Sequence, residues 1–128
     1  MKILLAVDGS SYTKKMLAYL AAHELFSPAN AYTAVTAQAA LPSQARAALG
    51  KALVQKYYED EALRVMAPVT KYLLRHGITA QCLWKTAKPG ELISKTATEG
   101  KFDLVVMGSH GHGAFLNLVM GSVATEVL

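Results

Sequence analysis

The chain has 128 residues, of which 52% are apolar and 17% are charged. This balance excludes an intrinsically disordered protein, and the length predicts a single domain over residues 1–128. The 13 lysines and arginines outnumber the 9 acidic residues, but they stand singly or in pairs, so no basic cluster indicates a nucleic-acid partner. A mildly positive, solvated surface would still attract phosphates.

The sequence also indicates the cellular compartment. No apolar run is long enough for the core of a signal peptide or for a membrane span. Cys82 is the single cysteine and cannot form an intramolecular disulfide. We expect it to be a small core residue within the apolar run 78–84. These features favour a cytoplasmic protein without a membrane partner.

The amino-terminal segment predicts a strand followed by a helix. Residues 2–7 form a short apolar run that ends in Asp-Gly-Ser-Ser, as a buried strand entering a turn would. Apolar residues then recur at helical spacing from Tyr12 until Ser27-Pro28 stops the pattern. Ser10 or Ser11 can cap the first free amides of this helix.

The middle of the chain predicts a second strand and a long helix. The β-branched run 32–37 favours a strand, and we expect the Ala-rich connection 38–50 to be ordered only in part. An amphipathic pattern over residues 51–76 predicts a helix, with Gly77 at its C-terminal capping position. Pro68 lies inside this pattern, so the helix should kink or break there.

Two further strands complete the predicted sheet. Residues 78–84 favour a third strand, residues 90–100 a short helix, and residues 102–107 (FDLVVM) a fully buried fourth strand. Strands that alternate with helices predict an α/β domain: a single doubly wound parallel sheet with helices on both faces. Ligands of such sheets bind beyond the carboxyl ends of the strands.

A glycine-rich stretch begins where the fourth strand should end. The segment 107–122 (MGSHGHGAFLNLVMGS) contains four of the nine glycines and leads into an apolar pattern typical of a helix. Glycines let backbone amides converge on an anion, and a following helix adds free N–H groups and the positive end of its dipole. The expected ligand is a phosphate. The apolar part, 114–120, favours core packing or a subunit contact.

The stretch differs from two common phosphate-binding loops. It contains neither G-x-x-x-x-G-K-[ST] nor G-x-G-x-x-G. Without the P-loop lysine it could hold a nucleotide while giving little help to phosphoryl transfer. No nucleophile or general base can be named either, so any hydrolysis should be slow. His110 and His112 are only two local donors, too few for a protein-ligated metal, and they favour contacts with a phosphate.

The spacing of the glycines resembles that of a known family. Gly108, Gly111, Gly121 and Ser122 form G-x-x-G-(nine residues)-G-S, which is similar to the ATP-binding signature of the universal stress protein family. The stretches ILLAVDGS, GELI and DLVVMGSHG agree, so the resemblance extends over residues 1–128. It implies a Rossmann-like fold of the adenine nucleotide alpha hydrolase type.

The resemblance also implies a set of binding residues. Asp8 would serve the adenosine end of the nucleotide, although DGSS also suits a turn that merely caps the first helix. Ala37 would line the adenine, and Met107 and Gly108 would contact the ribose and the nearby phosphate. The loop and helix beyond would present donors to the outer phosphates. The full implied set is Ala6, Val7, Asp8, Ala37, Met107, Gly108, Ser109, His110, Gly111, Gly121, Ser122 and Val123.

Three features depart from the family pattern. Ala6 stands where many members have proline, and Ala124 stands where some have a hydroxyl, so the affinity could be lower than the motif suggests. The family usually continues into a fifth strand used in pairing two subunits, whereas this chain ends at Leu128. We therefore expect the usual fifth strand to be missing, which would leave an open sheet edge that invites pairing.

Together these features predict an ATP-binding universal stress protein that acts as a nucleotide-dependent switch or sensor and forms a homodimer. Mg²⁺ would be held by the nucleotide phosphates rather than by the protein. The alternative is a dimerising interaction protein that binds AMP, a cyclic nucleotide or no nucleotide. A third possibility, a small nucleotidyl-transferring or hydrolysing enzyme, is disfavoured because no histidine-rich motif follows Val7.

Overall fold

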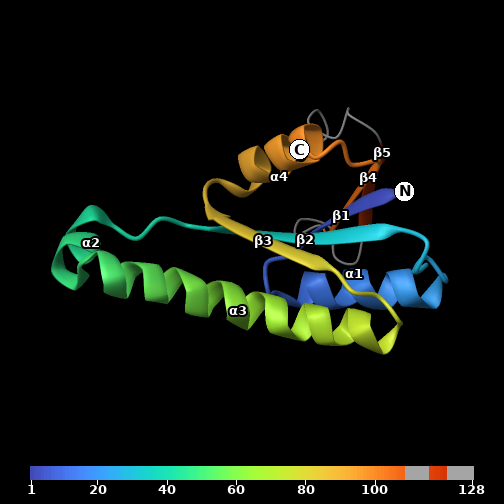
Figure 1. Ribbon diagram of the computed structural model, residues 1–128, viewed down its shortest axis with the longest axis horizontal. Coiled ribbons are helices and arrows are strands. Elements are labelled where there is room, and N and C mark those ends of the chain that lie inside the picture. Colours follow the sequence, from blue (N-terminus) through green and yellow to red (C-terminus); the bar gives the residue numbers. More distant parts are fainter. Residues whose placement is uncertain (109–115, 121–128) are drawn as a thin grey trace.

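The computed structural model describes residues 1–108 and 116–120 (Figure 1). No helix in this part of the chain is long and apolar enough to cross a membrane. The strands are β1 (Lys2–Ala6), β2 (Ala31–Gln38), β3 (Gln81–Thr86), β4 (Leu104–Gly108) and β5 (Leu116–Met120). The helices are α1 (Ser11–Ala22), α2 (Ser43–Leu49), α3 (Lys51–Arg75) and α4 (Pro89–Glu99).

The strands form one sheet in the order β3-β2-β1-β4-β5. The pairs β1–β2, β2–β3 and β1–β4 are all parallel. Helices α1 and α3 cover one face of this sheet and α4 covers the other (Figure 1). The predicted doubly wound α/β fold with helices on both faces is therefore confirmed.

The outer position beside β4 is occupied by β5, which runs antiparallel to β4. The sequence predicted that the usual fifth strand is missing, and within the described residues the parallel part of the sheet has four strands, as expected. For residues 114–120 it favoured core packing or a subunit contact, and the structure pairs residues 116–120 with β4, from Leu104 opposite Met120 to Gly108 opposite Leu116. This pairing covers the edge of β4 and leaves β5 at the edge of the sheet.

Two apolar clusters lie on opposite faces of the sheet, and β1 contributes to both. Ile3 and Leu5 pack with the buried residues of α1 and α3, whereas Leu4 packs with Leu92 and Ala97 of α4. Successive side chains of a strand point to opposite faces, so the short run Lys2–Ala6 builds two cores at once. This double burial explains why the run is almost continuously apolar.

Helix α3 ends in a hydrogen-bonded turn at the predicted glycine. The N–H groups of Gly77 and Ile78 donate to the carbonyl oxygens of Leu74 and Leu73, at 3.0 and 2.9 Å. Gly77 has φ of 75°, the left-handed conformation that this Schellman turn requires. The predicted capping role of Gly77 is confirmed.

Helix α1 ends in the same type of turn, but earlier than predicted. Glu24 has φ of 55°, and the N–H of Leu25 donates to the carbonyl of Leu20 at 2.9 Å. The helix therefore stops at Ala22 rather than continuing to Ser27. The amino-acid pattern did not signal this end because the left-handed position holds a glutamate and not a glycine.

The structure corrects the prediction of a partly ordered connection after β2, and of the two outcomes predicted at Pro68, a kink or a break, it excludes the break. The connection expected to be ordered only in part contains α2, which its run of alanines favours. Helix α3 continues through Pro68 without a break. Proline removes one backbone hydrogen bond, but Val65, Met66 and Val69 on both sides of it are buried in the core, and this packing holds the helix together.

Strand β3 starts at Gln81, three residues later than predicted, and it lies at the edge of the sheet. Cys82 is exposed there and is not a core residue. The apolar run around it misled the prediction, because Ile78 is buried before the strand begins. Partial desolvation raises the pKa of Cys82 above its ordinary value, so the thiol stays protonated at neutral pH.

The end of α4 yields a test of packing. A Cβ on Gly100 would lie 2.9 Å from Cδ2 of Phe102 and 3.0 Å from the carbonyl oxygen of Thr96. We expect Gly100→Ala to lower the free energy of unfolding by about 1–3 kcal/mol, measured by urea denaturation. Gly90→Ala is the matched control, since nothing lies within 4 Å of its Cβ position. Equal effects of the two changes would contradict the packing at Gly100.

Candidate functional site

A cavity of about 300 Å³ lies at the carboxyl ends of the parallel strands. It is bounded by the ends of β1, β2 and β4 and by the first turns of α1 and α4. Its lining residues are Ala6, Val7, Asp8, Tyr12, Thr13, Val35, Ala37, Pro89, Gly90, Ile93 and Met107. This is the edge where doubly wound sheets bind their ligands.

The chain topology creates this cavity. From β1 the chain crosses to β2 on one side through α1, whereas from β3 it crosses back over the sheet through α4 to reach β4 on the other side. The two crossovers leave in opposite directions next to β1, and a crevice opens where they part. Ala6 stands opposite Val35 on β2 and opposite Met107 on β4, so three strand ends meet at the same level.

Asp8 is held in place by hydrogen bonds from the start of α1. Its Oδ1 accepts from the backbone N–H of Ser10 at 2.9 Å, from the Ser10 hydroxyl at 2.6 Å and from the Thr13 hydroxyl at 3.0 Å. The backbone N–H of Asp8 donates to Oγ1 of Thr13 at 3.1 Å. Three donors on one oxygen fix the orientation of the carboxylate in the cavity wall.

These hydrogen bonds also give Asp8 a role in the fold. Ser10 is the N-cap of α1 and its hydroxyl accepts from the N–H of Tyr12 at 3.2 Å, as predicted for Ser10 or Ser11. The Asp8 side chain closes an Asx-type turn onto Ser10. Both readings of Asp8 therefore agree with the geometry, because the carboxylate that shapes the turn also lines the cavity.

Small side chains keep the cavity open. Ala6, Ala37 and Gly90 stand on three of its walls, from β1, β2 and α4. A neighbouring cavity of about 480 Å³ shares Ala37 and Pro89 and extends between residues 39–40 and 86–88. The first cavity lies at the lower end of the range usual for small-molecule sites, and the second adds room beside the end of β2.

The structure brings five of the twelve implied binding residues together, namely Ala6, Val7, Asp8, Ala37 and Met107. Gly108 follows directly as the last residue of β4. The other six lie outside the described residues, and their roles stay predictions from the sequence: Ser109, His110, Gly111, Gly121, Ser122 and Val123.

Sequence reasoning missed part of the wall. Thr13 and Ile93 are far apart in the chain, and neither carries a motif of its own. Pro89 and Gly90 reach the site because α4 starts there, with proline at the first helical turn. The available signal was the short run Pro-Gly-Glu-Leu before a helical pattern, which marks a helix start but does not reveal which strand ends face it.

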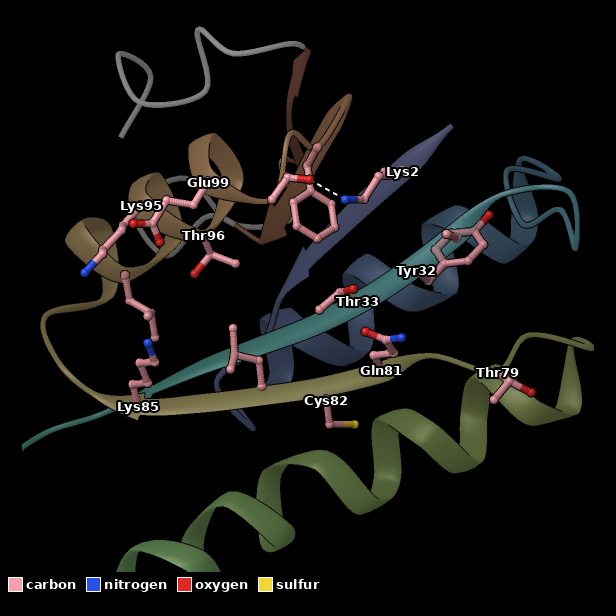
Figure 2. Close-up of a pocket in the computed structure, with 15 residues that line it drawn as sticks. Lys2, Tyr32, Thr33, Thr79, Gln81, Cys82, Lys85, Lys95, Thr96 and Glu99 are labelled. Carbon is pink, nitrogen blue, oxygen red and sulfur yellow. Dashed lines mark hydrogen bonds between the residues drawn. The ribbon is translucent and has the colours of Figure 1, made fainter.

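A larger cavity, of about 690 Å³, lies along β3 on the face of α4 (Figure 2). Its walls carry Lys85 and Lys95 together with Glu99, and it reaches Lys2 near the amino ends of the strands. The Lys2 ammonium donates to the Gly100 carbonyl (Figure 2) and lies 4.8 Å from the centre of the Phe102 ring. Size alone favours this cavity, but the smaller one stands at the topological switch point, so we take the smaller one as the candidate site.

The described residues contain no cluster of three or more histidine, cysteine, aspartate or glutamate side chains that could hold a metal ion. Within the described lining of the candidate site, Asp8 and Tyr12 are the ionisable side chains. The arrangement offers a fixed hydrogen-bond acceptor among apolar walls, which suits binding of a flat, partly apolar ligand that carries hydroxyl groups.

The fold and the position of the site define a doubly wound α/β protein with a cavity at its topological switch point. A model of the universal stress protein family matches residues 1–128. The chain therefore belongs to the universal stress protein family. A universal stress protein of Synechocystis sp. is 28% identical over 127 residues, which make up 99% of this chain but only 38% of that longer protein.

Solved structures agree on the fold. A universal stress protein family protein from Arabidopsis thaliana, crystallised with AMP bound, has a TM-score of 0.65 at 14% identity, covering 88% of this chain and 79% of that one. A protein of the same family from Burkholderia pseudomallei has a TM-score of 0.63 at 23% identity, covering 85% of this chain and 81% of that one.

The hydrogen bonds around Asp8 predict the effect of losing one hydroxyl. Thr13→Val removes a donor to the Asp8 carboxylate and the acceptor of the Asp8 N–H. Thr13 is almost fully buried, so we expect a loss of about 1–3 kcal/mol in the free energy of unfolding, measured in urea. Thr13→Ser keeps the hydroxyl and should cost clearly less. A larger loss for the serine variant would contradict this role.

Proposed function

We propose that the protein binds ATP in the cavity at the carboxyl ends of β1, β2 and β4 and acts as a nucleotide-dependent switch or sensor. One observation carries the proposal: five residues implied by the sequence line a single cavity at the topological switch point. The AMP bound to the Arabidopsis relative supports an adenine nucleotide as the ligand class.

The chemistry of the walls suggests how the nucleotide would lie. Ala37 and Ile93 provide apolar surfaces against which adenine would pack, with further room toward Pro89. The oriented Asp8 carboxylate is an acceptor for the ribose hydroxyls. The phosphates would then extend past Met107 toward the glycine-rich segment that starts at Gly108, with Mg²⁺ bound through the phosphate oxygens.

The proposal is for binding with little or no turnover. The hydroxyls that donate to Asp8, those of Ser10 and Thr13, also accept backbone N–H groups around the start of α1, and the oriented oxygen of Asp8 already accepts three hydrogen bonds, so these groups serve the local fold. We further propose that residues 1–128 form one domain, that the protein is a homodimer, and that it works in the cytoplasm, where ATP is available as the signal.

Two substitutions on β2 test which cavity holds the nucleotide. Ala37 lines the candidate site and Thr33 lines the larger cavity, on the same face of the same strand. We expect Ala37→Phe to weaken ATP binding by at least about tenfold, because the ring fills the space for adenine. Thr33→Phe should bind like the unchanged protein. Isothermal titration of nucleotide-free protein measures both, and circular dichroism checks the fold.

The reverse result, with binding lost in Thr33→Phe and kept in Ala37→Phe, would place the ligand in the larger cavity. If titration of the unchanged protein with ATP or AMP gives no heat of binding, the proposal of nucleotide binding is refuted. The alternative, an interaction protein, would then be favoured. This outcome would not affect the proposed homodimer, because dimerisation is measured in a separate experiment.

Comparison of ATP with AMP tests the glycine-rich segment. Tighter binding of ATP, with Mg²⁺ present, is expected if backbone amides hold the outer phosphates. We expect Gly111→Val or Gly121→Val to abolish ATP binding without unfolding the protein, since a side chain would block the approach of the phosphates. Full affinity in either variant would refute the loop assignment, and equal affinities for ATP and AMP would move recognition to the Asp8 end.

A further inference from the structure

The first part of α3 and the whole of α2 project from the body of the protein (Figure 1). We call residues 43–64 the arm. All the buried side chains of α3 belong to residues 58 and beyond, and α2 has none. The part of the arm before residue 58 buries no side chain, so a polar surface would be expected there if it stayed in water.

The arm instead carries large apolar side chains on its outer side. Leu53 is 55% exposed, Tyr57 44% and Leu63 64%. Residues at i, i+4 and i+10 lie on the same broad side of a helix, and this side is opposite to the one that buries Tyr58 and Val65. Large apolar side chains grouped in this way mark a contact surface.

The charges along the arm change sign part of the way along it. Arg46, Lys51 and Lys56 precede the run Glu59-Asp60-Glu61, and Arg64 follows it. At the change of sign the pattern is self-complementary when two copies meet in antiparallel orientation, because a two-fold axis near residue 58 places Lys56 of one copy against Asp60 of the other. A uniformly basic or acidic partner would be repelled by one half of the arm.

The hydrogen bonds and the ion pair within the arm show which of its charged side chains are already paired inside one copy. Glu59 accepts from Gln55 at 3.0 Å, and Glu61 pairs with Arg64 at 3.2 Å. Neither Lys56 nor Asp60 has an ion-pair partner among the described residues. Both point to the apolar outer side, one turn apart, next to Tyr57.

We propose that the arm is the contact surface of a homodimer, with α3 of one copy packed antiparallel against α3 of a second copy. A two-fold axis near residue 58 places Lys56 opposite Asp60 and Leu53 opposite Leu63, each twice. Tyr57 lies near the axis and covers the centre. This inference deepens the homodimer of the proposed function and does not depend on nucleotide binding.

A charge exchange tests the register as well as the surface. Lys56→Glu or Asp60→Lys alone should raise the dimer dissociation constant by about tenfold, because each puts like charges opposite each other twice. A mixture of the two single variants should associate like the unchanged protein, since opposite charges then meet at both positions. The double variant should also dimerise. Sedimentation velocity over a concentration series measures all of these.

The apolar contact has its own test and matched control. Leu53→Asn should weaken the dimer by at least about tenfold. Leu74→Asn changes an equally exposed leucine, 61% exposed, at the other end of the same helix, and it should leave the dimer unchanged. Circular dichroism and urea denaturation check that each variant is folded.

Four results would overturn the inference or part of it. A monomeric unchanged protein at all concentrations would refute both the arm contact and the homodimer of the proposed function. A dimer that is insensitive to the arm variants would refute the arm but keep the homodimer. Failure of the mixed single variants to associate would refute the antiparallel register. Loss of the dimer in Leu74→Asn would also contradict the assigned surface.

Discussion

Strand β1 is the element on which the rest of the structure depends. It is paired in parallel with a strand on each side, and Leu4 and Leu5 are completely buried on opposite faces. A shift of one residue in its register would exchange the side chains of the two faces and disrupt the packing of both cores. This constraint brings the ends of β1, β2 and β4 to one edge, and the chain leaves β1 there through Asp8. The candidate site is thus a consequence of how the core is packed.

The sequence predicted the order and type of the main elements because their physical causes are local. A buried strand, an amphipathic helix and Gly77 each leave a mark in consecutive residues. The predictions failed where distant contacts decide. Pro68 is tolerated inside α3 because the core packs on both sides of it, and Cys82 is exposed because the topology puts β3 at the sheet edge. The core contacts around Pro68 and the edge position of β3 cannot be inferred from the residues adjacent to them in the sequence.

The residues of the candidate site likewise fall into those that the sequence predicted and those that it did not. Asp8 and Ala37 follow apolar strands, so their place at the ligand edge was predictable, and the family resemblance named them. Thr13 has no motif, yet it orients Asp8 from one turn into α1. Ile93 enters from α4, whose crossover brings the chain back over the sheet to β4. These contributions depend on three-dimensional packing, which no spacing in the sequence encodes.

Tyr58 connects the arm to the candidate site. Its hydroxyl accepts from the N–H of Leu41 at 2.9 Å, and its carbonyl accepts from the side-chain amide of Gln38 at 3.5 Å. Its ring lies 6.2 Å from that of Trp84 on β3. Gln38 directly follows Ala37, which lines both cavities at the end of β2. Direct contacts of Tyr58 therefore join the arm to the residue that follows the proposed adenine position on β2.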